Sequence, residues 1–97
     1  MAEKINVEDY ARRRKAIPVG VGYEYELRIN KDQLITIPKR MVTAREILQL
    51  AGKDVASNQL CADYGNGRIM PVGNNDMIDL TQGVIKFITT PLQAVNG

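Results

Sequence analysis

The fold is decided by the stretch Thr43-Ala44-Arg45-Glu46-Ile47-Leu48-Gln49-Leu50-Ala51-Gly52. Thr43 and Glu46 have the spacing of a capping box, in which each side chain binds the backbone amide of the other residue. Four apolar residues follow at the spacing of one helix face: Ala44, Ile47, Leu48 and Ala51. Gly52 suits the left-handed position that ends a helix. The stretch predicts a helix over 44–51, which at two turns is stable only when packed on other elements.

Two strand-like runs precede this helix. Residues 23–30 alternate apolar and polar side chains, the pattern of a strand with one buried face. After a turn-like Asn30-Lys31-Asp32-Gln33, residues 34–37 form a second run that ends at Pro38, which cannot donate a backbone hydrogen bond. Two such runs across so short a gap predict a hairpin, whose apolar face would hold the helix.

The rest of the strands follow the helix. Residues 60–64 alternate as a third strand, and Tyr64-Gly65-Asn66-Gly67-Arg68 predicts a turn. Residues 69–72 predict a short edge strand because Pro71 is tolerated only at an edge or a bulge. Residues 77–80 predict a short turn that holds apolar side chains beneath the sheet. Residues 84–90 predict the last strand, which lies at the centre of the sheet. One helix covers one sheet face, so the fold class is α+β, with the helix across a mixed sheet of four to five strands.

The N-terminal segment is expected to differ from this body. Residues 1–22 hold five basic and three acidic side chains, whereas 23–97 hold eight of each sign. A short helix could begin at Asn6 and run to Lys15, but apolar residues are few, so we expect a flexible or weakly helical arm that the body does not need for folding. The basic run at 12–15 fits simple solvation, an acidic partner or nucleic acid. We expect a domain over 23–91 and a flexible tail over 92–97.

Composition argues against several functions. The chain has no histidine and one cysteine, Cys61, which excludes an internal disulfide and a multi-cysteine metal site. Cys61 is interpreted as a packing residue because nothing activates its thiol. No apolar run is long enough to span a bilayer, and no signal peptide is apparent. We therefore expect a cytoplasmic protein that is not an enzyme and has neither metal nor cofactor.

The order of elements resembles the ubiquitin-like β-grasp family, and more closely the bacterial ubiquitin-like and multiubiquitin domains found beside homologues of ubiquitin-activating enzymes, ubiquitin-conjugating enzymes and JAB-type peptidases. Besides 43–52, the likeness rests on Tyr25-Glu26-Leu27-Arg28-Ile29-Asn30, Asp76-Met77-Ile78-Asp79-Leu80 and Val84-Ile85-Lys86-Phe87-Ile88-Thr89-Thr90-Pro91. It covers 23–97 and implies that the first and last strands of the body lie side by side and parallel. One departure is Asn96 before Gly97, where such modifiers often carry two glycines.

The resemblance implies a protein modifier whose reacting group is the carboxylate of Gly97. An activating enzyme would adenylate it, a thioester on a conjugating enzyme would follow, and a target protein would supply the final nucleophile. Glycine has no Cβ to obstruct attack at its carbonyl. Partner enzymes, including a JAB-type peptidase, would recognise the tail residues Leu92, Gln93, Ala94, Val95 and Asn96. Candidate acceptors for chain growth are Lys31, Lys39, Lys53 and Lys86.

Two other functions stay open at this point. The first is a non-conjugated β-grasp interaction module that docks through its sheet. The second is a small nucleic-acid-binding protein that uses the basic segment. It is disfavoured because the body is neutral and lacks an aromatic platform for stacking bases.

Overall fold

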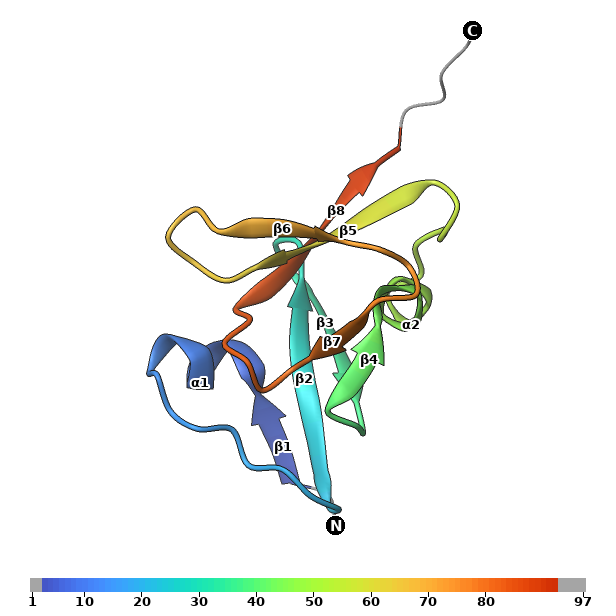
Figure 1. Ribbon diagram of the computed structural model, residues 1–97. Coiled ribbons are helices and arrows are strands. Elements are labelled where there is room, and N and C mark those ends of the chain that lie inside the picture. The colour runs from blue at the N-terminus through green and yellow to red at the C-terminus, as the bar shows by residue number, and fades with distance from the viewer. Residues whose placement is uncertain (1–2, 93–97) are drawn as a thin grey trace, which may run out of the picture.

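The computed structural model describes residues 3–92. Within that range the chain forms a six-stranded sheet, a separate two-stranded sheet and two short helices (Figure 1). The strands are β1 (Glu3–Asn6), β2 (Tyr23–Ile29), β3 (Gln33–Ile37), β4 (Met41–Thr43), β5 (Asn58–Asp63), β6 (Ile69–Val72), β7 (Met77–Asp79) and β8 (Lys86–Pro91). The helices are α1 (Val7–Arg12) and α2 (Ala44–Leu50).

The large sheet is organised around β2. One edge of β2 pairs antiparallel with β3, from Tyr25↔Ile37 to Ile29↔Gln33, as the predicted hairpin requires. The other edge pairs parallel with β1 up to Asn6↔Glu26 and then parallel with β8 at Ile29↔Phe87. Two strands from opposite ends of the chain therefore share one edge of β2, end to end. Beyond β8 the sheet continues antiparallel through β5 to β6 at its rim.

This topology confirms the expected β-grasp arrangement. The first and last strands of the predicted body, β2 and β8, are parallel neighbours, and β6 lies at an edge where Pro71 costs no ladder bond. The predicted turn before β6 also forms: the amide of Tyr64 donates to the carbonyl of Arg68, and Gly65 and Gly67 have positive φ. The sheet has six strands instead of four to five because β1 joins it.

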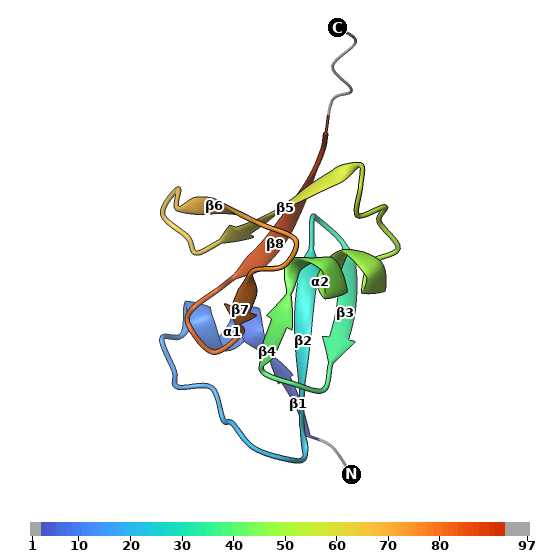
Figure 2. The same ribbon diagram turned by 45° about the vertical axis from the view of Figure 1, so that its right-hand side comes forward.

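Helix α2 forms where the capping box predicts it and lies across β2 and β3 (Figure 2). The Thr43 hydroxyl accepts from the Glu46 amide at 3.2 Å, and the Glu46 carboxylate accepts from the Thr43 amide at 3.3 Å. Gly52 follows the helix with a φ of +73°. The predicted apolar face, with Ile47 and Leu48 at its centre, is buried in one core with Tyr25, Leu27, Ile29, Leu60 and Phe87.

The interpretation of the N-terminal segment as a separable arm is wrong for the described residues. Ile5 and Val7 are 2% and 1% exposed and belong to the core, as does Ile17. The predicted helix start is confirmed, since the Asn6 side chain accepts from the Asp9 amide, but α1 ends at Arg12. The segment is held because β1 pairs with residues 23–26 of β2, the part of this edge that β8 does not reach, and because its few apolar side chains enter the core.

A second difference concerns the small sheet. Residues 77–80, expected to form a turn, include β7, which pairs antiparallel with β4. Strand β4 is not apparent in the sequence pattern. Ile78 and Leu80 are nevertheless buried, as predicted for apolar side chains beneath the sheet. The last strand begins at Lys86 instead of residue 84, and Val84 enters the core just before it.

Candidate functional site

The first feature of interest is the point at which β8 leaves the sheet. Its final register pair is Asn58↔Pro91, so β5 accompanies β8 to its last residue. Leu92, the next residue, donates its backbone amide to the carbonyl of Ser57 at 2.7 Å. The side chain of Leu92 is 52% exposed. The exit of the chain from the sheet is thus held by backbone bonds while its first side chain faces solvent.

The turn before β5 supports this exit. The Asp54 carboxylate accepts from the Ser57 hydroxyl at 2.5 Å and from the Ala56 amide at 3.3 Å, while the Asp54 carbonyl accepts from the Asn58 side chain at 3.0 Å. The Ser57 hydrogen bond, followed by that from Ala56, lowers the pKa of Asp54. A carboxylate at Asp54 therefore orders the turn whose carbonyl holds Leu92.

Asn30 fixes the other side of β8. Its amide donates to the carbonyl of Phe87 at 2.7 Å, its side-chain Nδ2 donates to the Thr89 hydroxyl at 2.9 Å, and its Oδ1 accepts from the Thr89 amide at 2.9 Å. Asn30 reaches this geometry with a φ of +55°, which asparagine tolerates better than most residues. One side chain therefore continues the β2–β8 ladder after β2 ends.

The expected tail residues can be placed only in part. Leu92 is exposed beside the exit. Gln93, Ala94, Val95, Asn96 and Gly97 lie outside the described residues. What the structure describes is the platform from which the tail begins.

The four candidate acceptor lysines are not gathered at one place. Lys31 is exposed in the turn after β2, and Lys39 is exposed between β3 and β4. Lys39 forms an ion pair with Glu46, and hydrogen bonding to Lys39 is the main reason that the pKa of Glu46 is lowered. Lys53 and Lys86 are half-buried.

The sheet face opposite α2 carries a small apolar strip. Cys61 pairs with Pro71 on β6 and with Ile88 on β8, and cross-strand partners share a face. Ile69 lies on the same face and is 49% exposed. Cys61 and Ile88 are half-buried there. We call Cys61, Ile69, Pro71 and Ile88 the outer strip.

Sequence reasoning missed the residues that hold the exit. The sequence pattern places Asn30 at the end of a strand run and in a turn, and asparagine at such a position also signals a left-handed conformation. Asp54 and Ser57 have the spacing of a local side-chain to backbone turn, which is a usable signal. Their link to Leu92 is not readable because it joins residues 35 positions apart in the sequence.

Two negative findings complete the site. In residues 3–92, no three side chains of His, Cys, Asp or Glu gather as metal ligands would. Over the same described range, no helix is long and apolar enough to cross a membrane.

The comparisons with known proteins identify one family. A family model described as Multiubiquitin matches residues 25–91. The match runs from the third residue of β2 to the end of β8, so β1 and α1 precede it. No curated protein and no solved structure gives a significant match.

Proposed function

The chain belongs to the multiubiquitin family, a ubiquitin-like β-grasp family, and from this premise we propose that it is a ubiquitin-like protein modifier of a bacterial conjugation pathway. In this proposal the domain is not an enzyme, and the reacting group is the carboxylate of Gly97. The pathway is cytoplasmic because adenylation of that carboxylate consumes ATP.

In this proposal, separate partner proteins carry out activation, transfer and removal of the modifier. An activating enzyme adenylates Gly97, a cysteine displaces the adenylate to give a thioester, and a nucleophile of the target protein takes the modifier. A JAB-type peptidase trims or removes it. These enzymes grip residues 92–96 as an extended strand, with main-chain hydrogen bonds providing affinity and the side chains of Leu92 and Val95 providing specificity.

One observation carries the proposal: the exit of β8 is held while the side chain beyond it is exposed. The bond from the Leu92 amide to the Ser57 carbonyl and the contacts of Asn30 with Thr89 fix where the tail starts. A fixed start reduces the conformational freedom that a partner enzyme must remove when it binds the tail. This supports recognition of the chain beyond the exit by a partner enzyme.

The direct test is the intact mass of the protein after incubation with its cognate activating enzyme, ATP and hydroxylamine. We expect a hydroxamate at the C-terminus, because hydroxylamine captures both the adenylate and the thioester. A variant without Gly97 should give no hydroxamate. It should melt at the same temperature as the parent chain, since the core of the described residues runs from Ile5 to Phe87 and changes away from a core usually alter stability by about 0.5 kcal/mol or less.

The control is Asn75→Ala, which changes an exposed residue of the loop between β6 and β7 and should react normally. If the chain without Gly97 is conjugated at the normal rate, the modifier proposal is wrong.

A second candidate, the non-conjugated docking module, is favoured by the outer strip. Ile69→Ser with Pro71→Ser removes apolar surface from that strip without touching the core side of the sheet. If docking through the sheet is the function, this double variant loses partner binding and deletion of Gly97 has no effect. The modifier proposal expects the double variant to form the hydroxamate normally.

A further inference from the structure

A cleft of about 280 Å³ separates the end of α1 from the turn between β5 and β6. Ala11, Arg12 and Arg14 line one wall, and Tyr64, Gly65 and Asn66 line the other. The cleft is near the lower limit of small-molecule sites, which hold roughly 300–1,000 Å³, and suits one or two side chains of a partner.

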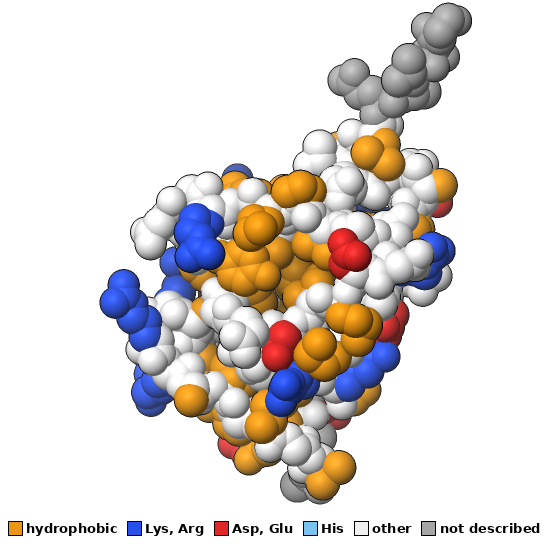
Figure 3. All heavy atoms as spheres, viewed as in Figure 1, with side chains coloured by type: hydrophobic (Ala, Val, Ile, Leu, Met, Phe, Trp, Pro, Cys, Tyr) orange, Lys and Arg blue, Asp and Glu red, His pale blue; other side chains and the backbone are white. Residues whose placement is uncertain are grey.

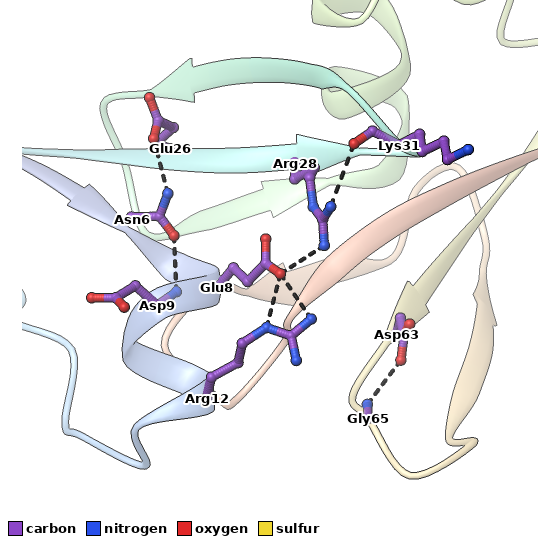
Figure 4. A network of polar contacts seen from close by, with 9 residues as sticks. All are labelled: Asn6, Glu8, Asp9, Arg12, Glu26, Arg28, Lys31, Asp63 and Gly65. Carbon is purple, nitrogen blue, oxygen red and sulfur yellow. Dashed lines mark hydrogen bonds and ion pairs between the residues drawn. The ribbon is translucent and has the colours of Figure 1, made fainter.

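Positive charge exceeds negative charge around this cleft. The Glu8 carboxylate accepts from Arg12 at 2.9 Å and from Arg28 at 2.7 Å, so one acid is shared by two guanidinium groups (Figure 4). A second acid next to the lining residues is Asp63, whose Oδ1 accepts from the Gly65 amide at 2.8 Å. Arg14 forms no ion pair with any carboxylate of residues 3–92.

Arg68 adds a further cation at the turn. Its guanidinium carbon lies 5.9 Å from the centre of the Tyr64 ring, and within the described part of the chain it too has no acidic partner. Lys15 and Lys86 lie next to the lining in the sequence. Figure 3 shows separate Lys and Arg side chains along the side of the molecule formed by α1 and the β5–β6 turn.

Arg14 occupies a backbone position that normally selects glycine. The Lys15 amide donates to the Tyr10 carbonyl and the Arg14 amide to the Ala11 carbonyl, which is the pattern of a helix end closed by a left-handed residue. Arg14 is that residue, with a φ of +55°. Folding alone would favour glycine here, so a strained arginine at the cleft wall indicates that its side chain has a functional role, such as binding a ligand.

Part of the cleft lining is apolar. Ile85 lines the cleft and lies so close to Gly65 that a Cβ there would be 2.8 Å from the Ile85 Cδ1. The Tyr64 ring packs partly against the core. A ligand that fits would therefore combine negative charge facing the arginines with a small apolar group facing Ile85.

We propose that this cleft binds an acidic segment of a partner protein, with carboxylates on Arg14 and Arg12 and an apolar side chain on Ile85. The planar guanidinium matches a carboxylate with two parallel hydrogen bonds. Nucleic acid fits less well because its phosphates form a continuous row, whereas the basic side chains around the cleft are interrupted by the carboxylates of Glu8 and Asp63. In addition, residues 23–97 carry no net charge.

The cleft is separate from the proposed conjugation site. Ile85 immediately precedes β8, whereas the tail leaves at the other end of that six-residue strand, roughly 20 Å away. A partner held in the cleft would leave the exit at Leu92 free.

The test uses the full chain labelled with ¹⁵N and two synthetic peptides, one alternating Glu and Leu and the other alternating Gln and Leu. With the Glu peptide we expect amide shifts at Arg12, Arg14, Gly65 and Asn66, and with the Gln peptide none. Arg14→Gly should weaken binding of the Glu peptide roughly 10-fold or more, as the loss of a hydrogen-bonded charge does. Its melting temperature should be equal to or higher than that of the parent chain, because glycine relieves the left-handed strain.

The matched control is Arg45→Gln, which removes one exposed charge on α2 with no carboxylate partner in the described range. It should change the affinity by less than about twofold. The proposal is overturned if both peptides bind equally, or if Arg14→Gly weakens binding no more than the control does. Tighter binding of a 12-nucleotide oligothymidylate at the same amides would overturn it in favour of nucleic acid.

Discussion

The side chain of Leu48, on α2, is in the core with no exposed surface, whereas that of Leu50, two residues later on the same helix, is 54% exposed. The same helix therefore offers a buried leucine and an exposed one. We expect Leu48→Ala to lower the free energy of unfolding by about 2–5 kcal/mol, because it removes buried methyl groups and leaves a cavity. Leu50→Ala should lower it by about 0.5 kcal/mol or less. Denaturant melts of both variants measure the difference, and equal losses would place Leu48 outside the core.

Ile5 gives the same test for the N-terminal segment. Its side chain is 2% exposed and lies in the core beside Tyr25, its register partner on β2. Ile5→Ala should cost about 2–5 kcal/mol in a denaturant melt. Val21→Ala is the control, since that side chain is fully exposed and should contribute little. A loss below about 0.5 kcal/mol for Ile5→Ala would mean that β1 is not part of the stable fold.

These two residues show what the sequence reveals and what it hides. The burial of Leu48 could be predicted because helical spacing is a local pattern, and its neighbours Ala44, Ile47 and Ala51 repeat the signal. The burial of Ile5 could not, because its partner lies 20 residues further along the chain and four residues are too few to show alternation. Asn30 was hidden for the same reason, since its contacts with Thr89 span 59 residues.

At the scale of elements, β1 and α1 act as a piece of the sheet. They supply the parallel partner for residues 23–26 of β2 and place Val7 in the core. Glu8 on α1 also binds Arg28 on β2 at 2.7 Å (Figure 4). A chain that lacks residues 1–22 would expose the edge of β2 and the apolar surface beneath these elements.

We therefore expect removal of residues 1–22 to destabilise the domain. The truncated protein should melt at a lower temperature than the full chain and show poorer dispersion of its amide resonances. Arg13→Ala is the comparison, since it removes only an exposed ion pair with Asp9. Unchanged melting of the truncated protein would restore the view of this segment as a dispensable arm.

Which elements were predictable follows from their length and partners. Helix α2 carries its own cap and apolar face, and the β2–β3 hairpin forms between neighbours in sequence. Strands β4 and β7 have three residues each, and they pair across more than 30 residues, so neither has a pattern that identifies it alone. Strand β8, from which the tail leaves, was predictable from its apolar run. The hydrogen bonds that hold the chain at its end, from Leu92 to Ser57 and from Asn30 to Thr89, were not.

At the scale of the whole molecule, three carboxyl groups with lowered pKa values are distributed over separate regions. Hydrogen bonding from Lys39 lowers the pKa of Glu46, and hydrogen bonding from Ser57 lowers the pKa of Asp54. Partial burial raises the pKa of Asp79. Hydrogen bonds from the Thr81 hydroxyl and amide, together with the charge of Arg40, outweigh this effect, so the pKa is lowered overall.

A group whose pKa is lowered by folding stabilises the folded state above its unfolded pKa, and this contribution is lost as the pH falls through the folded value. The ordinary values are 4.5 for Glu46 and 3.8 for Asp54 and Asp79. We expect the free energy of unfolding to decrease as the pH falls below about 4.5, and to continue decreasing below 3.8. Denaturant melts at pH 7, 4 and 2.5 measure this trend.

Asp79→Asn should make the trend shallower. Asparagine keeps the Oδ1 that accepts from Thr81 but loses the charge that faces Arg40 at 3.4 Å. Leu50→Ala, which removes no charge, should keep the full dependence on pH. A pH dependence in Asp79→Asn as steep as in the parent would mean that Asp79 contributes nothing to acid stability.

The shared edge of β2 also has a mechanical consequence. Strand β1 begins at one end of the sheet, and β8 runs parallel to it and leaves at the opposite end (Figure 1). Tension applied between Glu3 and Leu92 would run along the strands and load the hydrogen bonds of β1–β2, β2–β8 and β5–β8 in shear. Bonds loaded this way break as a group and not one after another. A motor that pulls on the end of β8 would have to rupture the middle of the sheet first, so the domain should withstand forced extraction better than its short strands suggest.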